Sequence, residues 1–148
     1  MKISILLPYK ENFTPDYAGA VSLFINDTIE LSKYKKKIQV YGNTSFKKKL
    51  LSNYTNLNFS KIFFRSSSKV YVKKFLDIEK IKKSNLIEIH NRPDYINSIY
   101  EINNNIVLYF HNNPLEMKSS KTVKERIDIL NKTKKIIFNS YWTLNQFM

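Results

Sequence analysis

Short apolar runs alternate with longer amphipathic stretches along the chain, and this alternation predicts strands and helices in turn. Nearly continuous runs of β-branched and aliphatic residues are typical of strands that are covered on both faces. The predicted strands cover residues 2–8, 37–42, 57–64, 85–90, 105–111 and 134–140. Between them, apolar residues recur every three or four positions, which indicates a buried stripe on a helix. The predicted helices cover residues 18–34, 46–53, 69–84, 92–104, 119–133 and 141–148.

Residues that favour the first turn of a helix stand at three of the predicted helix starts. Pro93 opens one helix, and proline suits the first turn because the amide groups there have no partner within the helix. Serine and asparagine side chains accept hydrogen bonds from such amides and are therefore good N-caps. The predicted caps are Ser119 or Ser120 for the helix at 119–133, and Asn139 and Ser140 for the helix at 141–148.

The regular alternation of strands and helices predicts an α/β fold. We expect a three-layer α/β/α, Rossmann-like domain with a mostly parallel sheet of about six or seven strands, because consecutive parallel strands need helical crossovers. With 148 residues, of which 43% are hydrophobic, the chain can form one domain with its own core. Ligands of such sheets bind beyond the carboxyl ends of the strands. The residues that follow each predicted strand are therefore the candidates for a site.

A long polar loop follows the first predicted strand and leads to Gly19 and Ala20 at the start of the next helix. Gly19 is one of only two glycines in the chain. Because glycine has no side chain, it lets a ligand or a backbone segment approach a helix N-terminus closely, where anions bind well. Gly19 and Ala20 are therefore candidate binding residues. Packing of the helix against the sheet would also explain a glycine at this position.

Polar residues follow the strand predicted at 85–90. His90 ends this strand, and Arg92 stands just before the helix that Pro93 opens. A guanidinium group beside a helix N-terminus makes a good site for an anion or a sugar hydroxyl. A histidine at a strand end also often serves the structure alone, so His90 by itself decides nothing.

The next strand ends in His111, which is followed by Asn112, Asn113 and, after a proline, Glu116. Histidine is the commonest general base near neutral pH, and amides with carboxylates suit polyhydroxylated ligands. Asn-Asn before proline is also an ordinary turn signal. Since His90 and His111 end successive strands, we interpret them as walls of one crevice. His111 is the candidate catalytic residue, and the others are candidates for substrate binding.

The formal net charge of +13 arises from 25 basic residues, of which only three are arginines. Attraction to the phosphates of nucleic acid or of an anionic membrane surface would explain this charge. An AT-rich coding bias, which the abundance of lysine, asparagine and isoleucine indicates, would explain it as well. Proteins that read base sequence rely on arginine, so we expect no nucleic-acid partner.

Several functional classes lack their sequence signatures. The chain contains no cysteine, no GxGxxG or GxxxxGK[ST] loop, no HExxH or Asp-x-Asp motif and no GxSxG elbow. Dinucleotide-binding, P-loop, metal-dependent and serine-hydrolase functions therefore lose their main support, and we expect neither a metal nor a cofactor. No apolar run approaches the roughly 18 residues of a membrane-spanning helix, and the short run before Pro8 does not suit a signal peptide.

Four segments, in order along the chain, resemble the N-terminal half of a GT-B glycosyltransferase of the large retaining family 4. They are LLPYKENFTPDYAGAVS (6–22), IEIHNRPDYI (87–96), VLYFHNNPLEMKSSKTVKER (107–126) and KIIFNSYWTLNQF (135–147). The resemblance implies a single acceptor-side domain over residues 1–148, with the donor-binding C-terminal domain absent from this chain. It implies transfer of a sugar from a nucleotide-sugar to a lipid-linked, lipopolysaccharide or polysaccharide acceptor of the bacterial cell envelope, by a chain that is incomplete alone.

The resemblance also implies roles for the candidate residues. The loop around Gly19 would lie near the acceptor and the donor phosphates, His90 and Arg92 would line the cleft, and His111 would face the sugar near the reaction centre. Family members act in the cytoplasm at the inner face of the membrane, where a basic domain would touch anionic lipid. Relatives often carry Asp where Asn113 stands, so this chain has one negative charge fewer there. A basic α/β domain that binds nucleic acid or regulates a partner, without catalysis, is the alternative.

Overall fold

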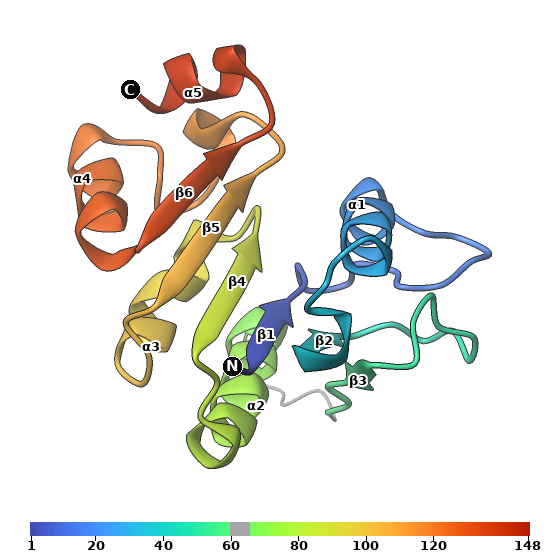
Figure 1. Cartoon of the computed structure of the whole chain (residues 1–148). Coiled ribbons are helices and arrows are strands. Elements are labelled where there is room, and N and C mark those ends of the chain that lie inside the picture. Colours follow the sequence, from blue (N-terminus) through green and yellow to red (C-terminus); the bar gives the residue numbers. More distant parts are fainter. Residues whose placement is uncertain (60–65) are drawn as a thin grey trace.

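The computed structural model of the chain describes residues 1–59 and 66–148, and a six-stranded sheet runs through its centre (Figure 1). The strand order is β3-β2-β1-β4-β5-β6, and every neighbouring pair is parallel. The strands are β1 (Ile3–Leu6), β2 (Ile38–Gly42), β3 (Tyr54–Asn56), β4 (Leu86–His90), β5 (Ile106–Phe110) and β6 (Lys135–Phe138).

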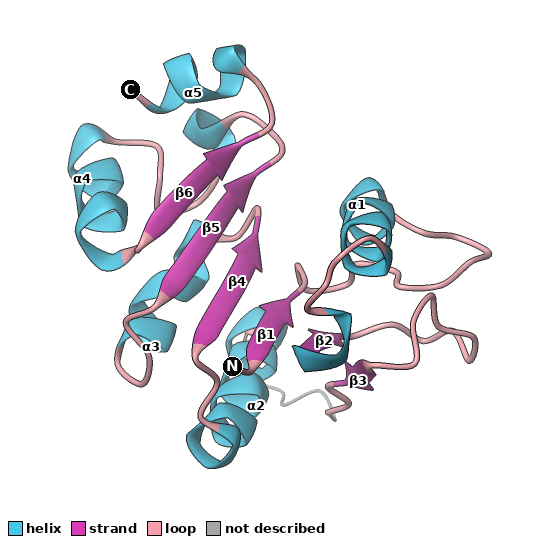
Figure 2. Ribbon diagram, viewed as in Figure 1, coloured by secondary structure: helices cyan, strands magenta, loops and turns pink. Residues whose placement is uncertain are grey.

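Among the described residues, five α-helices and three 3-10 turns accompany the strands, and the last helix follows the last strand (Figure 2). The helices are α1 (Ala20–Glu30), α2 (Ser67–Lys82), α3 (Ile96–Tyr100), α4 (Val123–Lys132) and α5 (Tyr141–Phe147), and the turns are Lys35–Lys37, Pro93–Tyr95 and Pro114–Glu116. The predicted α/β fold class is confirmed, with helices flanking a single all-parallel sheet. Among the described residues, no helix combines the length and the hydropathy that crossing a membrane requires.

Each face of the sheet has its own apolar core, because successive side chains of a strand point to opposite faces. Ile5 of β1 packs with Ile25 and other residues of α1 on one face. The next residue, Leu6, packs on the other face with Phe75 of α2 and Ile89 of β4, in a cluster to which α3, α4 and α5 also contribute. Burial on both faces explains why central strands such as β1 and β5 are apolar at almost every position.

The strand order reverses between β1 and β4, because the chain first builds β2 and β3 on one side of β1 and then crosses to the other side. In open parallel sheets, this reversal opens a crevice at the carboxyl ends of the two central strands. The loop before α1 and the ends of β4 and β5 all lie at this edge of the sheet. The topology therefore brings together the segments that hold the predicted site residues.

The segment between β2 and β3 differs from its prediction. No helix forms over 46–53, because hydrogen bonds to distant segments hold this part of the chain in an irregular path. The Leu50 N–H donates to the Phe13 carbonyl (3.4 Å), and the Asn53 side chain donates to the Ile38 carbonyl (2.9 Å). The strand predicted at 57–64 is wrong where the structure describes it, since β3 covers Tyr54–Asn56. Residues 60–65 of that prediction lie outside the described part of the chain.

The start of α4 also differs from its prediction. The N-cap is Thr122, whose hydroxyl accepts from the Glu125 backbone N–H (3.2 Å), while the Glu125 carboxylate accepts from the Thr122 N–H (2.9 Å). This capping box satisfies two free amides at once, so Thr122 and not a serine defines the helix start. Ser120 is buried and donates to the Pro114 carbonyl, and Ser119 has a positive φ of 69°. The predicted cap Ser140 is confirmed at α5.

Candidate functional site

Two histidine rings meet at the carboxyl ends of β4 and β5. His90 is the last residue of β4, and it pairs in register with Tyr109, two positions before His111. The ring centroids of the histidines are 5.2 Å apart, and Nδ1 of His90 lies 2.8 Å from Nε2 of His111. The parallel register thus joins by a hydrogen bond two residues that lie 21 positions apart in the chain.

Glu88 extends this pair into a chain of three side chains, and the sequence analysis missed it. Its Oε1 lies 2.7 Å from Nε2 of His90, which is completely buried. Glu88 and His90 are two positions apart on one strand, so their side chains leave the same face of the sheet. The signal was visible in the segment LIEIH, where an otherwise apolar strand carries two polar residues at alternate positions.

The hydrogen-bonding capacity of the three groups determines which nitrogen carries each proton. An ionised carboxylate only accepts, so Nε2 of His90 must donate to Glu88. Nδ1 of a neutral His90 then accepts from Nε2 of His111. The lone pair on Nδ1 of His111 is left without a partner among the described residues. Nδ1 of His111 is therefore the atom at which these three hydrogen-bonded side chains can accept a proton from a ligand.

The electrostatic surroundings keep His111 neutral at physiological pH. Burial lowers the pKa of His111 from 6.5 to about 4; the neighbouring His90 adds to this shift, and the negative charge of Glu88 opposes it. A neutral imidazole keeps the lone pair that a hydroxyl proton needs as its acceptor. The low pKa also means that a proton taken up there needs the nearby carboxylate to stabilise it.

Aromatic side chains surround the two histidines. Tyr109 stacks on His90 with centroids 4.8 Å apart and an interplanar angle of 7°. Phe24 of α1 packs its ring edge-on against His111 at 5.0 Å, and 40% of its surface remains exposed. Flat apolar rings beside polar groups suit a ligand that has both an apolar face and hydroxyl groups. The site therefore combines a proton acceptor with a flat apolar wall.

Asn91 ties the ends of β4 and β5 together and is a second residue that the sequence analysis missed. Its buried side chain accepts from the backbone N–H groups of His111 (2.7 Å) and Asn112 (3.3 Å), and its φ is 51°. Asparagine tolerates this left-handed conformation better than most residues. The adjacent Arg92 donates to the Asn91 carbonyl (2.9 Å). Burial raises the pKa of Asp94, and the positive charge of Arg92 opposes part of this shift.

The other residues predicted after β5 form a capped turn. Oδ1 of Asn113 accepts from the Leu115 N–H (3.1 Å), and its Nδ2 donates to Glu116 (3.2 Å). The side chain of Asn112 is exposed. Asn139, which follows β6, donates to the carbonyl of His111 (2.8 Å) and so links the ends of β5 and β6. The residues after His111 thus form a polar turn, which is the alternative that Asn-Asn before proline predicted.

The close approach expected at Gly19 is made by the chain itself. Glu11 accepts from the backbone N–H of Ser22 in the first turn of α1 (3.1 Å). A Cβ atom on Gly19 would lie only 2.0 Å from the same carboxylate oxygen. Gly19 has a φ of −74°, so it is the lack of a side chain and not its backbone freedom that the fold uses. In this structure a carboxylate therefore occupies the place next to Gly19 and Ala20 where we expected an anionic ligand.

Comparisons with known proteins add no assignment. The sequence matches no protein-family model, and no curated protein is significantly similar to it. The described residues also contain no group of three or more histidine, cysteine, aspartate or glutamate side chains that could hold a metal ion. The function proposed below therefore rests on the geometry of the site.

Proposed function

We propose that the chain is the acceptor-binding domain of a glycosyltransferase that transfers a sugar from a nucleotide-sugar to a lipid-linked, lipopolysaccharide or polysaccharide acceptor. The observation that carries the proposal is the hydrogen-bonded chain Glu88–His90–His111 at the carboxyl edge of the sheet. This edge is where parallel α/β domains bind their ligands. The four segments that resemble family 4 glycosyltransferases contain all three residues.

In the proposed reaction, an acceptor hydroxyl donates its hydrogen bond to Nδ1 of His111. The hydroxyl oxygen forms a bond to the anomeric carbon of the donor sugar, and the bond from that carbon to the nucleoside diphosphate breaks. The hydroxyl proton passes to His111, and the positive charge of its ring is balanced by Glu88 through His90. General-base help of this kind typically contributes about 10²–10⁴-fold to a rate.

The exposed Phe24 ring, which lies beside Tyr109, would support the acceptor sugar next to His111. A second, donor-binding domain would hold the nucleotide-sugar, either as a continuation of the chain or as a separate subunit. With an apolar or lipid-linked acceptor, the enzyme would act in the cytoplasm at the inner face of the membrane. The net charge of +13 favours contact with anionic lipid.

Sugar transfer by the complemented enzyme tests the proposal. The donor-binding half of a family 4 enzyme would be supplied in trans or fused, and transfer from radiolabelled nucleotide-sugars would be measured. We expect His111→Ala to reduce transfer by about 100-fold. Asn104→Ala is the matched control, because Asn104 is exposed and lies before β5, at the opposite edge of the sheet. Unchanged transfer in His111→Ala would remove His111 from the mechanism.

A further inference from the structure

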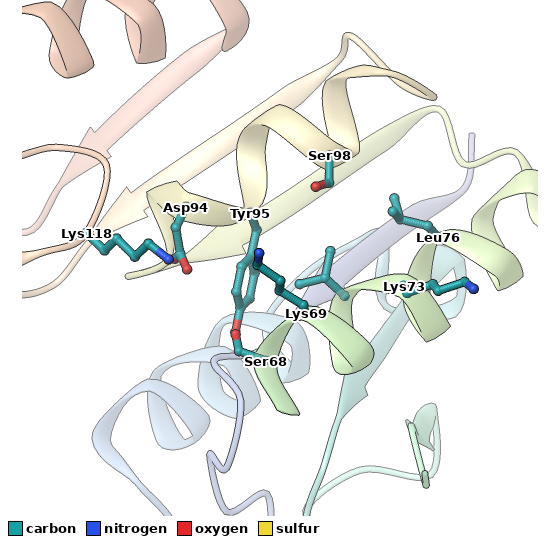
Figure 3. Close-up of a pocket in the computed structure, with 9 residues that line it drawn as sticks. Ser68, Lys69, Lys73, Leu76, Asp94, Tyr95, Ser98 and Lys118 are labelled. Carbon is teal, nitrogen blue, oxygen red and sulfur yellow. The ribbon is translucent and has the colours of Figure 1, made fainter. Parts of the chain in front are cut away.

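A pocket lies on the opposite face of the sheet from the histidines. Its volume is about 340 Å³, and it is lined by the start of α2, the turn Pro93–Tyr95 with α3, and the loop before α4 (Figure 3). Tyr95 and Val72, which belong to the core on this face, form part of its lining. Glu88, His90 and His111 do not line it. The proposed glycosyltransferase site therefore does not account for this pocket.

Positive charge dominates the lining of this pocket. Lys69 and Lys73 of α2 and Lys118 of the loop before α4 all line it, and Asp94 is the single acidic residue in the lining. None of the three ammonium groups forms an ion pair within the described part of the chain. Lys69 and Lys73 are four positions apart on one helix face, and like charges at this spacing destabilise a helix unless an anion lies between or beside them.

The uncharged groups of the pocket are hydrogen-bond donors beside an apolar surface. The hydroxyl of Tyr95 accepts from the Tyr9 N–H (3.2 Å) and from Ser68 (3.3 Å), so its own proton has no acceptor among the described residues. Ser68 lies in the first turn of α2, a 16-residue helix with no acidic residue in that turn. The N-terminus of this helix adds a partial positive charge. Val72 and Leu76 provide apolar surface next to these donors.

We infer that this pocket binds a phosphate monoester that carries an apolar group. The ammonium groups of Lys69 and Lys118 approach the pocket from two different segments, as Figure 3 shows, and either can reach a phosphate oxygen. The apolar group of the ligand packs on Val72 and Leu76. Asp94 opposes the anion, since its carboxylate lies in the same lining as the lysines. The inference does not depend on sugar transfer, and its test needs no donor-binding domain.

Titration of the full chain with phenyl phosphate tests the inference. Isothermal calorimetry gives the dissociation constant, and amide shifts of Ser68, Lys69 and Ser98 in ¹⁵N spectra locate the ligand. We expect K69Q/K118Q to weaken binding about tenfold, because two charges close to the phosphate are lost. Asp94→Asn should tighten binding about threefold, because it removes the opposing charge.

Two further arms of the experiment separate specific binding from general attraction. K47Q/K48Q is the matched control, since it removes the same charge from two exposed lysines outside the pocket. An equal loss in both double variants, or no binding of phenyl phosphate, would overturn the inference. Vesicles of phosphatidylcholine with phosphatidic acid distinguish the sources of the phosphate. Competition between these vesicles and phenyl phosphate identifies a lipid headgroup, whereas binding of phenyl phosphate without vesicle binding identifies a soluble ester.

Discussion

The histidine pair predicts a pH dependence of stability that one substitution should remove. His111 lies in a site where burial lowers its pKa from 6.5 to about 4. Below pH 6.5 the unfolded chain takes up a proton at this residue, and the folded protein does not take up that proton until about pH 4. The unfolded state therefore binds more protons within this window, so stability must fall as the pH is lowered through it.

The size of this loss follows from the two pKa values. With a pKa of 6.5 in the unfolded chain and about 4 in the folded protein, the free energy of unfolding falls by about 2 kcal/mol from pH 7 to pH 5, and by about 3 kcal/mol by pH 4. The substitution His111→Gln removes the titrating ring, while its amide N–H can still donate to Nδ1 of His90. The contribution from this residue should then vanish from the pH profile.

Urea unfolding followed by far-ultraviolet circular dichroism at pH 7, 6 and 5 measures both profiles. Other titrating groups are shared by the two proteins and cancel in the comparison. We expect wild type to lose about 2 kcal/mol more than His111→Gln between pH 7 and pH 5. If both lose the same free energy of unfolding, His111 is not held neutral by burial, and the proton assignment in the site is wrong.

Two other predictions concern the carboxylates of the site. Glu88→Gln keeps an acceptor oxygen opposite His90 but removes the negative charge that raises the pKa of His111, so the midpoint of the His111 ring titration in ¹⁵N spectra should fall; an unchanged midpoint would contradict the relay. Gly19→Ala should destabilise the protein by about 0.5–1.5 kcal/mol in thermal melts, because its Cβ displaces the Glu11 carboxylate from its hydrogen bond with the Ser22 N–H. Glu11→Ala in the same chain should restore most of that loss relative to Glu11→Ala alone, and no recovery would exclude this contact as the cause.

Local patterns in the sequence were sufficient to predict the class of fold. Apolar runs determine which segments can form strands of the sheet, and this alone predicted β1, β4, β5 and β6 close to their observed bounds. The same reasoning failed over 46–53. There, Leu50 and Asn53 bond to Phe13 and Ile38, residues of other segments that lie outside the predicted helix.

The candidate site was predictable only in part. The sequence placed His90 and His111 at strand ends, because each follows an apolar run directly. It could not show that the rings bond to each other, since that contact depends on β4 and β5 being neighbours in parallel register. The roles of Glu88 and Glu11 likewise depend on contacts with other segments.

Sequence by itself thus determined the periodicity of the elements, the burial of the strands and the chemical types available at their ends. Tertiary structure decided which of these groups meet: Glu88 with His90 and His111, Glu11 with the α1 N-terminus, and lysines from two segments around one pocket. The physical reason is that propensity and period act over a few residues, whereas strand order and register bring together side chains that are far apart in the chain.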